Sequence, residues 1–327
     1  MNPITTRDFL KLALSMTALA GTGSAALAQE ARPIQLYIPF PPGGVVDLVG
    51  RAFARPLGES LDQPIVLVNR GGAGGAIGMA QAARAEPNGL TALATHSAIL
   101  SLPRSEALFG RQTGFSLESF EPIALLSADH TVLVVHSSAP WKTFDEFLQD
   151  ARRRPDEITY ASSGAYGALQ LPIEMLSAAA GIRLRHIPFA GGGPAINAVL
   201  GKTVDLTVGS PGTIAPYIKA GTMRALVSTG ARRPTSLPAI PTAIELGLKD
   251  VEAYLWVGLS LPKGTPRPVV DRMKAAASRA SRDEAYLKSL TAVGSEIDFR
   301  EAAAFQKFLA EDDARTAAAI QRIGKVE

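Results

Sequence analysis

Residues 35–61 join a strand, a glycine turn and a helix, and this arrangement limits the fold more than any other part of the sequence. Residues 36–38 (LYI) favour a strand, residues 39–44 (PFPPGG) break regular structure, and an amphipathic helix pattern starts near Val45. Backbone N–H groups at a helix start have no partner within the helix, and the helix dipole adds positive potential there. A turn of this kind can bind an anion without a charged side chain.

The same order of strand, small-residue turn and helix recurs along the chain. It is found at residues 64–83, 158–176 and 184–200, and long apolar strands are expected near residues 131 and 254. Strands that alternate with helices predict parallel sheets covered on both faces. Two α/β lobes joined by extended crossings near 131 and 254 would explain the long strands there. Ligands of such sheets bind beyond the carboxyl ends of the strands, so turns from both lobes would open toward one cleft.

The N-terminus has the three parts of a secretory signal. Arg7 and Lys11 precede an alanine-rich apolar segment that ends in Ala26-Leu27-Ala28, a cleavage motif. Cleavage after Ala28 would start the mature chain at Gln29. The general secretory route is favoured, and the twin-arginine route stays open. No later apolar run reaches the roughly 18 residues that a membrane span needs.

Composition excludes several classes of function. The chain of 327 residues is 46% hydrophobic and 19% charged, with a formal net charge of +3, and its charges are scattered, which argues against a nucleic-acid partner. There is no cysteine, so disulfides, thiolate metal sites and cysteine nucleophiles are excluded. The four histidines lack metal-site spacing, and G-x-S-x-G is absent. Residues 71–78 (GGAGGAIG) do not form a dinucleotide motif, and tight packing of a helix on its strand explains these glycines better.

Two aspartates have a functional and a structural interpretation. Asp47 lies in the first turn of the expected helix, where complementing the helix dipole is the simpler role. Asp205 lies within an apolar strand and needs a partner if it is buried. That partner is either a ligand or a neighbouring turn, and the sequence does not decide between them.

Seven segments in this order and spacing resemble the substrate-binding proteins of tripartite tricarboxylate transporters, the Bug (TctC-like) family of periplasmic receptors. The resemblance covers essentially the whole mature chain. It is carried by IPFPPGGVVDLVGR, VNRGGAGGAIG, ITYASSG, HIPFAGGGPAINAVLGKTVDL, APYIKAGTMRALVSTGARR, LPAIPTAIELGL and WVGLSLPKGTP.

The resemblance implies a two-lobe α/β periplasmic-binding-protein fold of type II, a Venus flytrap that closes on a small organic acid. Residues 1–28 would be the signal peptide, residues 29–131 with 254–327 the first lobe, and residues 132–253 the second. It implies a periplasmic, monomeric protein without catalysis, cofactor or metal. Its partners would be a carboxylate ligand and either the subunits of a membrane permease or a sensor kinase. An exported enzyme that uses the same cleft is the alternative from another class, and no activated nucleophile, metal set or acid–base pair supports it.

The resemblance also implies a set of ligand-binding residues, at the positions of this sequence that match the binding site of the family. They are Phe40, Gly43, Gly44, Val45, Val46 and Asp47 in the first loop, Thr95, His96 and Ser97 after the third strand, and Ser162, Ser163, Gly164, Ala165, Tyr166 and Asp205 in the second lobe. Two positions depart from the family pattern. Val46 replaces a small hydroxyl residue. After Ser162-Ser163-Gly164 the family usually has a small residue and a hydroxyl, with a histidine three residues later, whereas this chain has Tyr166, Gly167 and Gln170. If Tyr166 faces the cleft, the ligand is less hydrophilic or flatter than a tricarboxylate; if it faces solvent, backbone groups alone hold the ligand.

Overall fold

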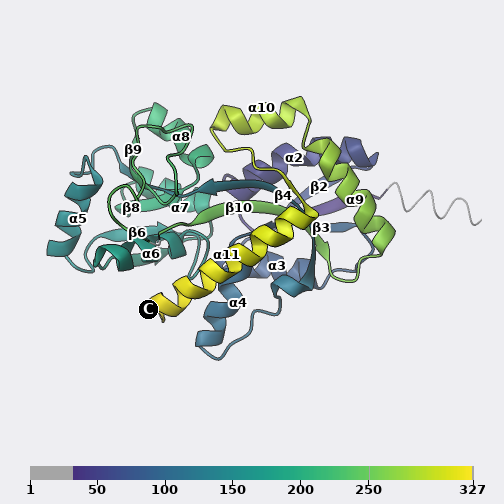
Figure 1. The fold of residues 1–327 in the computed structure, drawn as a ribbon, viewed down its shortest axis with the longest axis horizontal. Coiled ribbons are helices and arrows are strands. Elements are labelled where there is room, and N and C mark those ends of the chain that lie inside the picture. Colours follow the sequence, from purple (N-terminus) through teal and green to yellow (C-terminus); the bar gives the residue numbers. More distant parts are fainter. Residues whose placement is uncertain (1–31, 250, 326–327) are drawn as a thin grey trace, which may run out of the picture.

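Two β-sheets organise the computed structural model, which describes residues 32–249 and 251–325 (Figure 1). The predicted signal peptide, residues 1–28, lies outside the described residues. We call the part built on the six-stranded sheet lobe 1 and the part built on the five-stranded sheet lobe 2. The two-lobe α/β fold expected from the sequence is confirmed. We propose lobe boundaries near residues 131 and 254, where the chain passes from one sheet to the other.

The sheet of lobe 1 mixes parallel and antiparallel strands. Its spatial order is β11 (Arg300–Glu301), β4 (Phe120–His130), β10 (Tyr254–Pro262), β3 (Thr91–His96), β1 (Ile34–Ile38) and β2 (Ile65–Asn69). β1 runs parallel to β2 and β3, whereas β10 runs antiparallel to both β3 and β4. The last residue of β3, His96, pairs with Val257 of β10, which brings the carboxyl end of β3 beside the crossing strand.

The sheet of lobe 2 is mixed in the same way. Its spatial order is β7 (Arg185–Pro188), β6 (Thr159–Ser162), β8 (Leu206–Gly209), β5 (Val132–His136) and β9 (Met223–Ser228). β6 is parallel to β7 and β8, and β5 is antiparallel to β8 and β9. The prediction of parallel sheets was therefore wrong for β5, β10 and β11, which run opposite to the other strands of their sheets. β5 and β10 each follow a crossing between the lobes, so they enter their sheets from the opposite direction.

Helices cover both sheets, and two helices of lobe 1 also contact helices of lobe 2. Lobe 1 contains α2 (Val45–Leu61), α3 (Ala76–Ala83), α4 (Ala98–Leu108), α9 (Arg267–Ala280), α10 (Glu284–Val293) and α11 (Ala302–Ile323), and lobe 2 contains α5 (Phe144–Arg153), α6 (Gln170–Ala180), α7 (Gly192–Leu200) and α8 (Pro211–Lys219). α11 packs on α4 and β4 of lobe 1, and its far end meets α6 of lobe 2 (Figure 1). The C-terminal helix is therefore placed to sense the relative position of the lobes.

The core of each lobe lies between its sheet and its helices. In lobe 1, Phe53 of α2 is fully buried, and its ring centroid lies 5.0 Å from that of Tyr286 on α10. Trp256 of β10 is also fully buried and donates its indole N–H to Asp312 of α11 over 2.7 Å. A buried tryptophan needs such an acceptor, so this contact fixes α11 against the strand that crosses between the lobes.

Candidate ligand-binding site

The loop between β1 and α2 is shaped by a buried carboxylate. Asp47 is only 3% exposed and accepts hydrogen bonds from the backbone N–H of Gly43 (3.1 Å), from Asn69 Nδ2 (3.0 Å) and from Arg51 (2.8 Å). Asn69 also donates to the carbonyl of Phe40 over 2.9 Å. Gly43 has φ of +94°, a conformation that glycine adopts at no steric cost. Asp47 therefore holds the turn in place and does not line the pocket.

The starts of two helices, one from each lobe, face each other across the cleft. A Cβ atom added to Gly44, the residue before α2, would lie 3.8 Å from the backbone nitrogens of both Gly192 and Gly193 at the start of α7. Within residues 32–249 and 251–325, the N–H groups of Val45, Val46 and Gly192 make no hydrogen bond. Both helix dipoles direct their positive ends at this point, so it attracts an anion.

Three polar side-chain atoms at the same place lack hydrogen-bond partners. They are Nε2 of His96, Oγ of Ser97 and Oγ of Ser163, all buried from solvent. An unsatisfied buried polar group costs about 1–3 kcal/mol. Such groups are rare in native proteins, and three together indicate a site that a ligand completes.

His96 is held as a neutral donor. Its Nδ1 accepts the backbone N–H of Ala98 over 3.2 Å, which leaves the proton on Nε2. Burial lowers the pKa of His96 to about 3, because the charged ring would lose its hydration. The imidazole therefore stays uncharged at neutral pH and offers a single N–H.

The cleft pocket formed by these groups covers about 370 Å³ of space between atoms, part of which is open to solvent. Its lining residues are Phe40, Gly44, Val45, Val46, His96, Ser97, Ser163, Ala168, Leu169, Gly192, Leu255 and Trp256. None of these described residues carries a charged side chain. The Phe40 ring packs 4.6 Å from the His96 ring, between centroids. The pocket thus combines a small set of uncharged donors with a mostly apolar wall.

The structure brings seven of the sequence-predicted residues together in this pocket: Phe40, Gly44, Val45, Val46, His96, Ser97 and Ser163. Gly43 and Ala165 are exposed beside it. Gly164 is buried at the contact between the lobes, where an added Cβ would lie 2.8 Å from the backbone nitrogen of Gly74. The glycine-rich segment at residues 71–78 therefore serves the lobe contact as well as helix packing.

Tyr166 does not line the cleft pocket, and it does not point to solvent. It is 7% exposed, its hydroxyl donates to the carbonyl of Gly324 over 3.2 Å, and its ring meets Phe109 edge-on at 6.1 Å. Its φ of +52° and the bond from its N–H to Gln170 turn the side chain away from the pocket. Both interpretations of Tyr166 were wrong, because its partner at the end of α11 is 158 residues away in the sequence.

Three other predicted residues have partners elsewhere. Asp205 is exposed at the amino-terminal end of β8, where its carboxylate accepts the N–H and hydroxyl of Thr159, both over 2.8 Å. Thr95 donates to Ser260 over 2.7 Å inside the sheet. Ser162 Oγ accepts the N–H of Gly164 over 3.1 Å and lies 2.6 Å from Nε2 of His186. Asp205 thus bonds a neighbouring element and lies away from the cleft.

Sequence reasoning missed five lining residues: Ala168, Leu169, Gly192, Leu255 and Trp256. Gly192 belongs to a glycine turn before a helix, the same signal that identified Gly44. Leu255 and Trp256 lie in the strand that crosses between the lobes, and a crossing must pass the floor of the cleft. Ala168 and Leu169 had no comparable signal.

The described residues show no other site of a familiar kind. Among residues 32–249 and 251–325, no three histidine, cysteine or acidic side chains are grouped so that they could hold a metal ion. No helix in the described part of the chain is both long and apolar enough to cross a bilayer. The cleft pocket is therefore the place where the helix starts, the unpaired donors and the lobe contact coincide.

Comparisons with known proteins agree with this architecture. The family model described as "Tripartite tricarboxylate transporter family receptor" matches residues 49–325. A protein from the tcbD–tcbE intergenic region of Pseudomonas sp. strain P51 is 33% identical over 284 residues, covering 86% of this chain and 84% of that one. The periplasmic binding protein BugD has a TM-score of 0.83 at 31% identity, with 90% of this chain and 98% of that chain covered.

A liganded structure is also similar. MatC from Rhodopseudomonas palustris, solved with bound malate, has a TM-score of 0.82 at 28% identity, with 88% of this chain and 99% of that chain covered. The family model spans most of this chain, and the similarity extends over both lobes. The chain belongs to the tripartite tricarboxylate transporter receptor family, the Bug proteins.

Proposed function

We propose that this protein is a periplasmic receptor that binds a small organic acid in the cleft pocket. The carboxylate would sit between the starts of α2 and α7 and accept hydrogen bonds from Ser163, His96 and Ser97. The observation that carries the proposal is the presence of three unpaired buried donors where two helix starts meet. The malate bound to MatC supports a carboxylate as the ligand class.

The donors are sufficient without a cationic side chain. A hydrogen bond to a charged group contributes about 1.5–3 kcal/mol. Four or five preorganised donors can therefore supply the roughly 8 kcal/mol of micromolar binding, after part is lost to ordering the ligand. Closure of the lobes excludes water and strengthens each of these bonds.

The pocket wall favours an acid with an apolar body. Val46 stands where the family usually has a hydroxyl, and it lines the pocket beside Phe40, Leu169 and Leu255. A citrate-like ligand would place additional carboxylates against these side chains, where they would lose hydration without gaining donors. A monocarboxylate with an aliphatic or aromatic body avoids that cost.

Closure gives the bound state a surface that a partner can recognise. Lobe 1 and lobe 2 touch at Gly74 and Gly164, and α11 reaches from one to the other. A ligand that bridges the starts of α2 and α7 stabilises this closed arrangement by population shift. We propose that a membrane permease recognises the closed form and takes up the acid. We also propose that the receptor itself performs no reaction. Hydrogen-bond donors and apolar side chains line the pocket, as expected for binding.

A thermal-shift screen of the mature chain tests the proposal. Citrate, malate, hexanoate, benzoate and glutamate are suitable probes, and a ligand should raise the melting temperature as its concentration rises. We expect hexanoate or benzoate to give a larger shift than citrate. Tight citrate binding with no response to either of the other two acids would contradict the apolar-body argument, and turnover of a bound acid would contradict the receptor function.

Two variants of Gly44 place the ligand in the cleft. In Gly44→Ala the new methyl group would meet Gly192 and Gly193 at 3.8 Å, an ordinary contact, so the shift should persist. In Gly44→Leu the longer side chain would fill the space between the helix starts, so the shift should disappear while the circular dichroism spectrum stays native. A shift that survives in Gly44→Leu would show that the acid binds elsewhere.

A further inference from the structure

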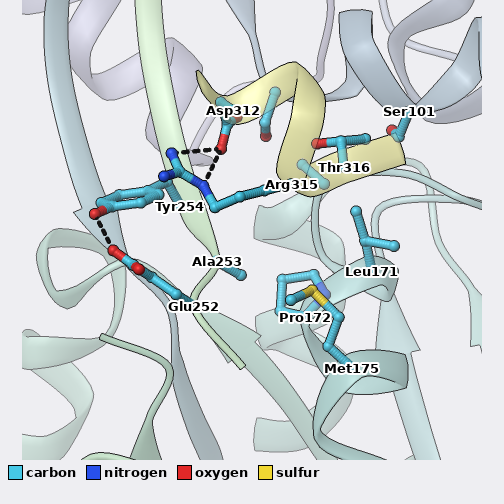
Figure 2. Close-up of a pocket in the computed structure, with 12 residues that line it drawn as sticks. Ser101, Leu171, Pro172, Met175, Glu252, Ala253, Tyr254, Asp312, Arg315 and Thr316 are labelled. Carbon is cyan, nitrogen blue, oxygen red and sulfur yellow. Dashed lines mark hydrogen bonds and ion pairs between the residues drawn. The ribbon is translucent and has the colours of Figure 1, made fainter. Parts of the chain in front are cut away.

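A second chamber adjoins the cleft pocket and covers about 400 Å³ of space between atoms, part of which is open to solvent. It lies between α6 of lobe 2 and α11 of lobe 1, beside the first residues of β10 (Figure 2). Leu171 and Met175 of α6 form one wall, and Arg315 and Thr316 of α11 face them from the other side (Figure 2). Both lobes contribute walls, so this chamber is complete only when the lobes are closed.

The two spaces adjoin each other. Ser97 and Ala168 line both the cleft pocket and the second chamber. The Oγ atom of Ser97 is one of the three unpaired buried atoms described above, so an unpaired hydroxyl belongs to the shared wall. The other end of a ligand whose carboxylate occupies the cleft pocket would enter the second chamber beside this hydroxyl.

The far end of the second chamber carries more negative than positive charge. Arg315 donates to Asp312 over 3.2 Å and stacks over Tyr254, with its guanidinium carbon 5.1 Å from the ring centroid. Glu252 accepts the hydroxyl of Tyr254. Two carboxylates and one guanidinium, which is already paired with Asp312, thus line this chamber. A second anionic group on the ligand would be repelled, whereas an uncharged chain would pack against Leu171 and Met175.

We propose that the second chamber receives the distal part of the ligand and selects monocarboxylates with an elongated, uncharged body. This inference rests on the proposed function, because the carboxylate must be anchored in the cleft pocket first. Each methylene buried in the chamber should tighten binding about fourfold, equivalent to about 0.8 kcal/mol. The affinity of the receptor therefore depends on the length of the ligand's hydrocarbon chain as well as on its carboxylate.

Isothermal titration calorimetry with three acids tests the inference. Hexanoate has two methylenes more than butanoate and should bind about sixteenfold more tightly if both enter the chamber. Adipate has the same number of carbons as hexanoate but a second carboxylate, and it should bind at least tenfold more weakly than hexanoate. Adipate that binds more tightly than hexanoate would overturn the proposal that the second chamber disfavours a second carboxylate.

A variant that fills the second chamber tests whether the tighter binding of hexanoate than of butanoate depends on this chamber. Leu171→Trp should bring the Kd for hexanoate to that for butanoate and leave the Kd for butanoate unchanged. Ala178→Trp adds the same side chain on the exposed side of α6 and is the matched control, with no expected change. If Leu171→Trp does not fold, Thr316→Leu narrows the same chamber from α11.

The outcomes separate the two proposals. Equal affinities for butanoate and hexanoate, with a clear signal for both, would overturn the second chamber as a ligand subsite and leave the receptor function standing. A wild-type protein that binds neither these acids nor any acid of the thermal-shift screen would overturn the proposed function, and the chamber's role with it.

Discussion

Replacing Gly164 by alanine should disfavour the closed arrangement of the two lobes without unfolding the protein. Gly164 of lobe 2 has φ of +122°, and an added Cβ would lie 2.8 Å from the backbone nitrogen and 2.9 Å from the Cα of Gly74 in lobe 1. The φ of +122° lies outside the left-handed α region and costs a residue with a Cβ about 1–3 kcal/mol whether the lobes are open or closed. The clash exists only in the closed form and costs about 1–3 kcal/mol, as overpacking does elsewhere. Only this second cost enters the binding equilibrium, so the Kd should rise about 5- to 150-fold.

The matched control is Gly181→Ala at the end of α6. Gly181 has φ of +63°, and no atom lies within 4 Å of an added Cβ, so the variant carries backbone strain without a lobe contact. Urea denaturation should show a loss of unfolding free energy in both variants, about 1–2 kcal/mol for Gly181→Ala and about 1–3 kcal/mol for Gly164→Ala. Calorimetry with the acid that gives the largest thermal shift should show weaker binding only for Gly164→Ala. An unchanged Kd for Gly164→Ala would refute the reasoning, because closure would then not require this contact.

Three further predictions follow from single side chains. Ser163→Ala removes an unpaired buried hydroxyl. Calorimetry should therefore show binding about 10- to 150-fold weaker, while the unfolding free energy of the free protein does not fall. Ser127→Ala removes an unpaired buried hydroxyl outside the pocket and should leave the Kd unchanged. Burial raises the pKa of Asp129 from 3.8 to about 7, so the folded state binds the carboxyl proton more tightly than the unfolded state does. The stability that this proton adds is fully present below about pH 4 and is lost as the pH rises toward 7. Asp129→Asn should therefore be more stable than wild type in urea at pH 8, and the difference should shrink toward pH 4; a difference that grows on acidification would contradict this. Asp47→Ala removes the acceptor that holds the first loop, so denaturant unfolding should show a loss of about 2 kcal/mol together with weaker acid binding, and native affinity would show that the loop keeps its shape without Asp47.

Local sequence patterns predicted the parts of the site that lie within a single strand–turn–helix unit. The strand, glycine turn and helix at residues 35–61 placed Gly44, Val45 and Val46 at the helix start, because a breaker cluster before an amphipathic run leaves few alternatives. The turn at residues 162–164 was found in the same way. These signals need only the residues within one strand–helix unit.

Long-range contacts decided what local patterns could not. Ser162 and Ser163 are neighbours, yet Ser162 bonds His186 on the adjacent strand and Ser163 faces the pocket unpaired. The orientation of Tyr166 depends on Gly324 at the end of α11. Whether strands run parallel depended on where the chain crosses between lobes, which periodicity does not reveal. Asp205 looked like a buried carboxylate because its strand is apolar, but it lies at the strand's exposed first end.

A crystal structure of the mature protein with its tightest-binding acid is the decisive test of this binding mode. We expect carboxylate oxygens at about 3 Å, hydrogen-bond distance, from Ser163 Oγ and from the N–H groups at the starts of α2 and α7. We also expect the body of the acid to point past Ser97 toward α11. A carboxylate bound away from both helix starts, or one that leaves Ser163 and His96 without a partner, would contradict the proposed binding site.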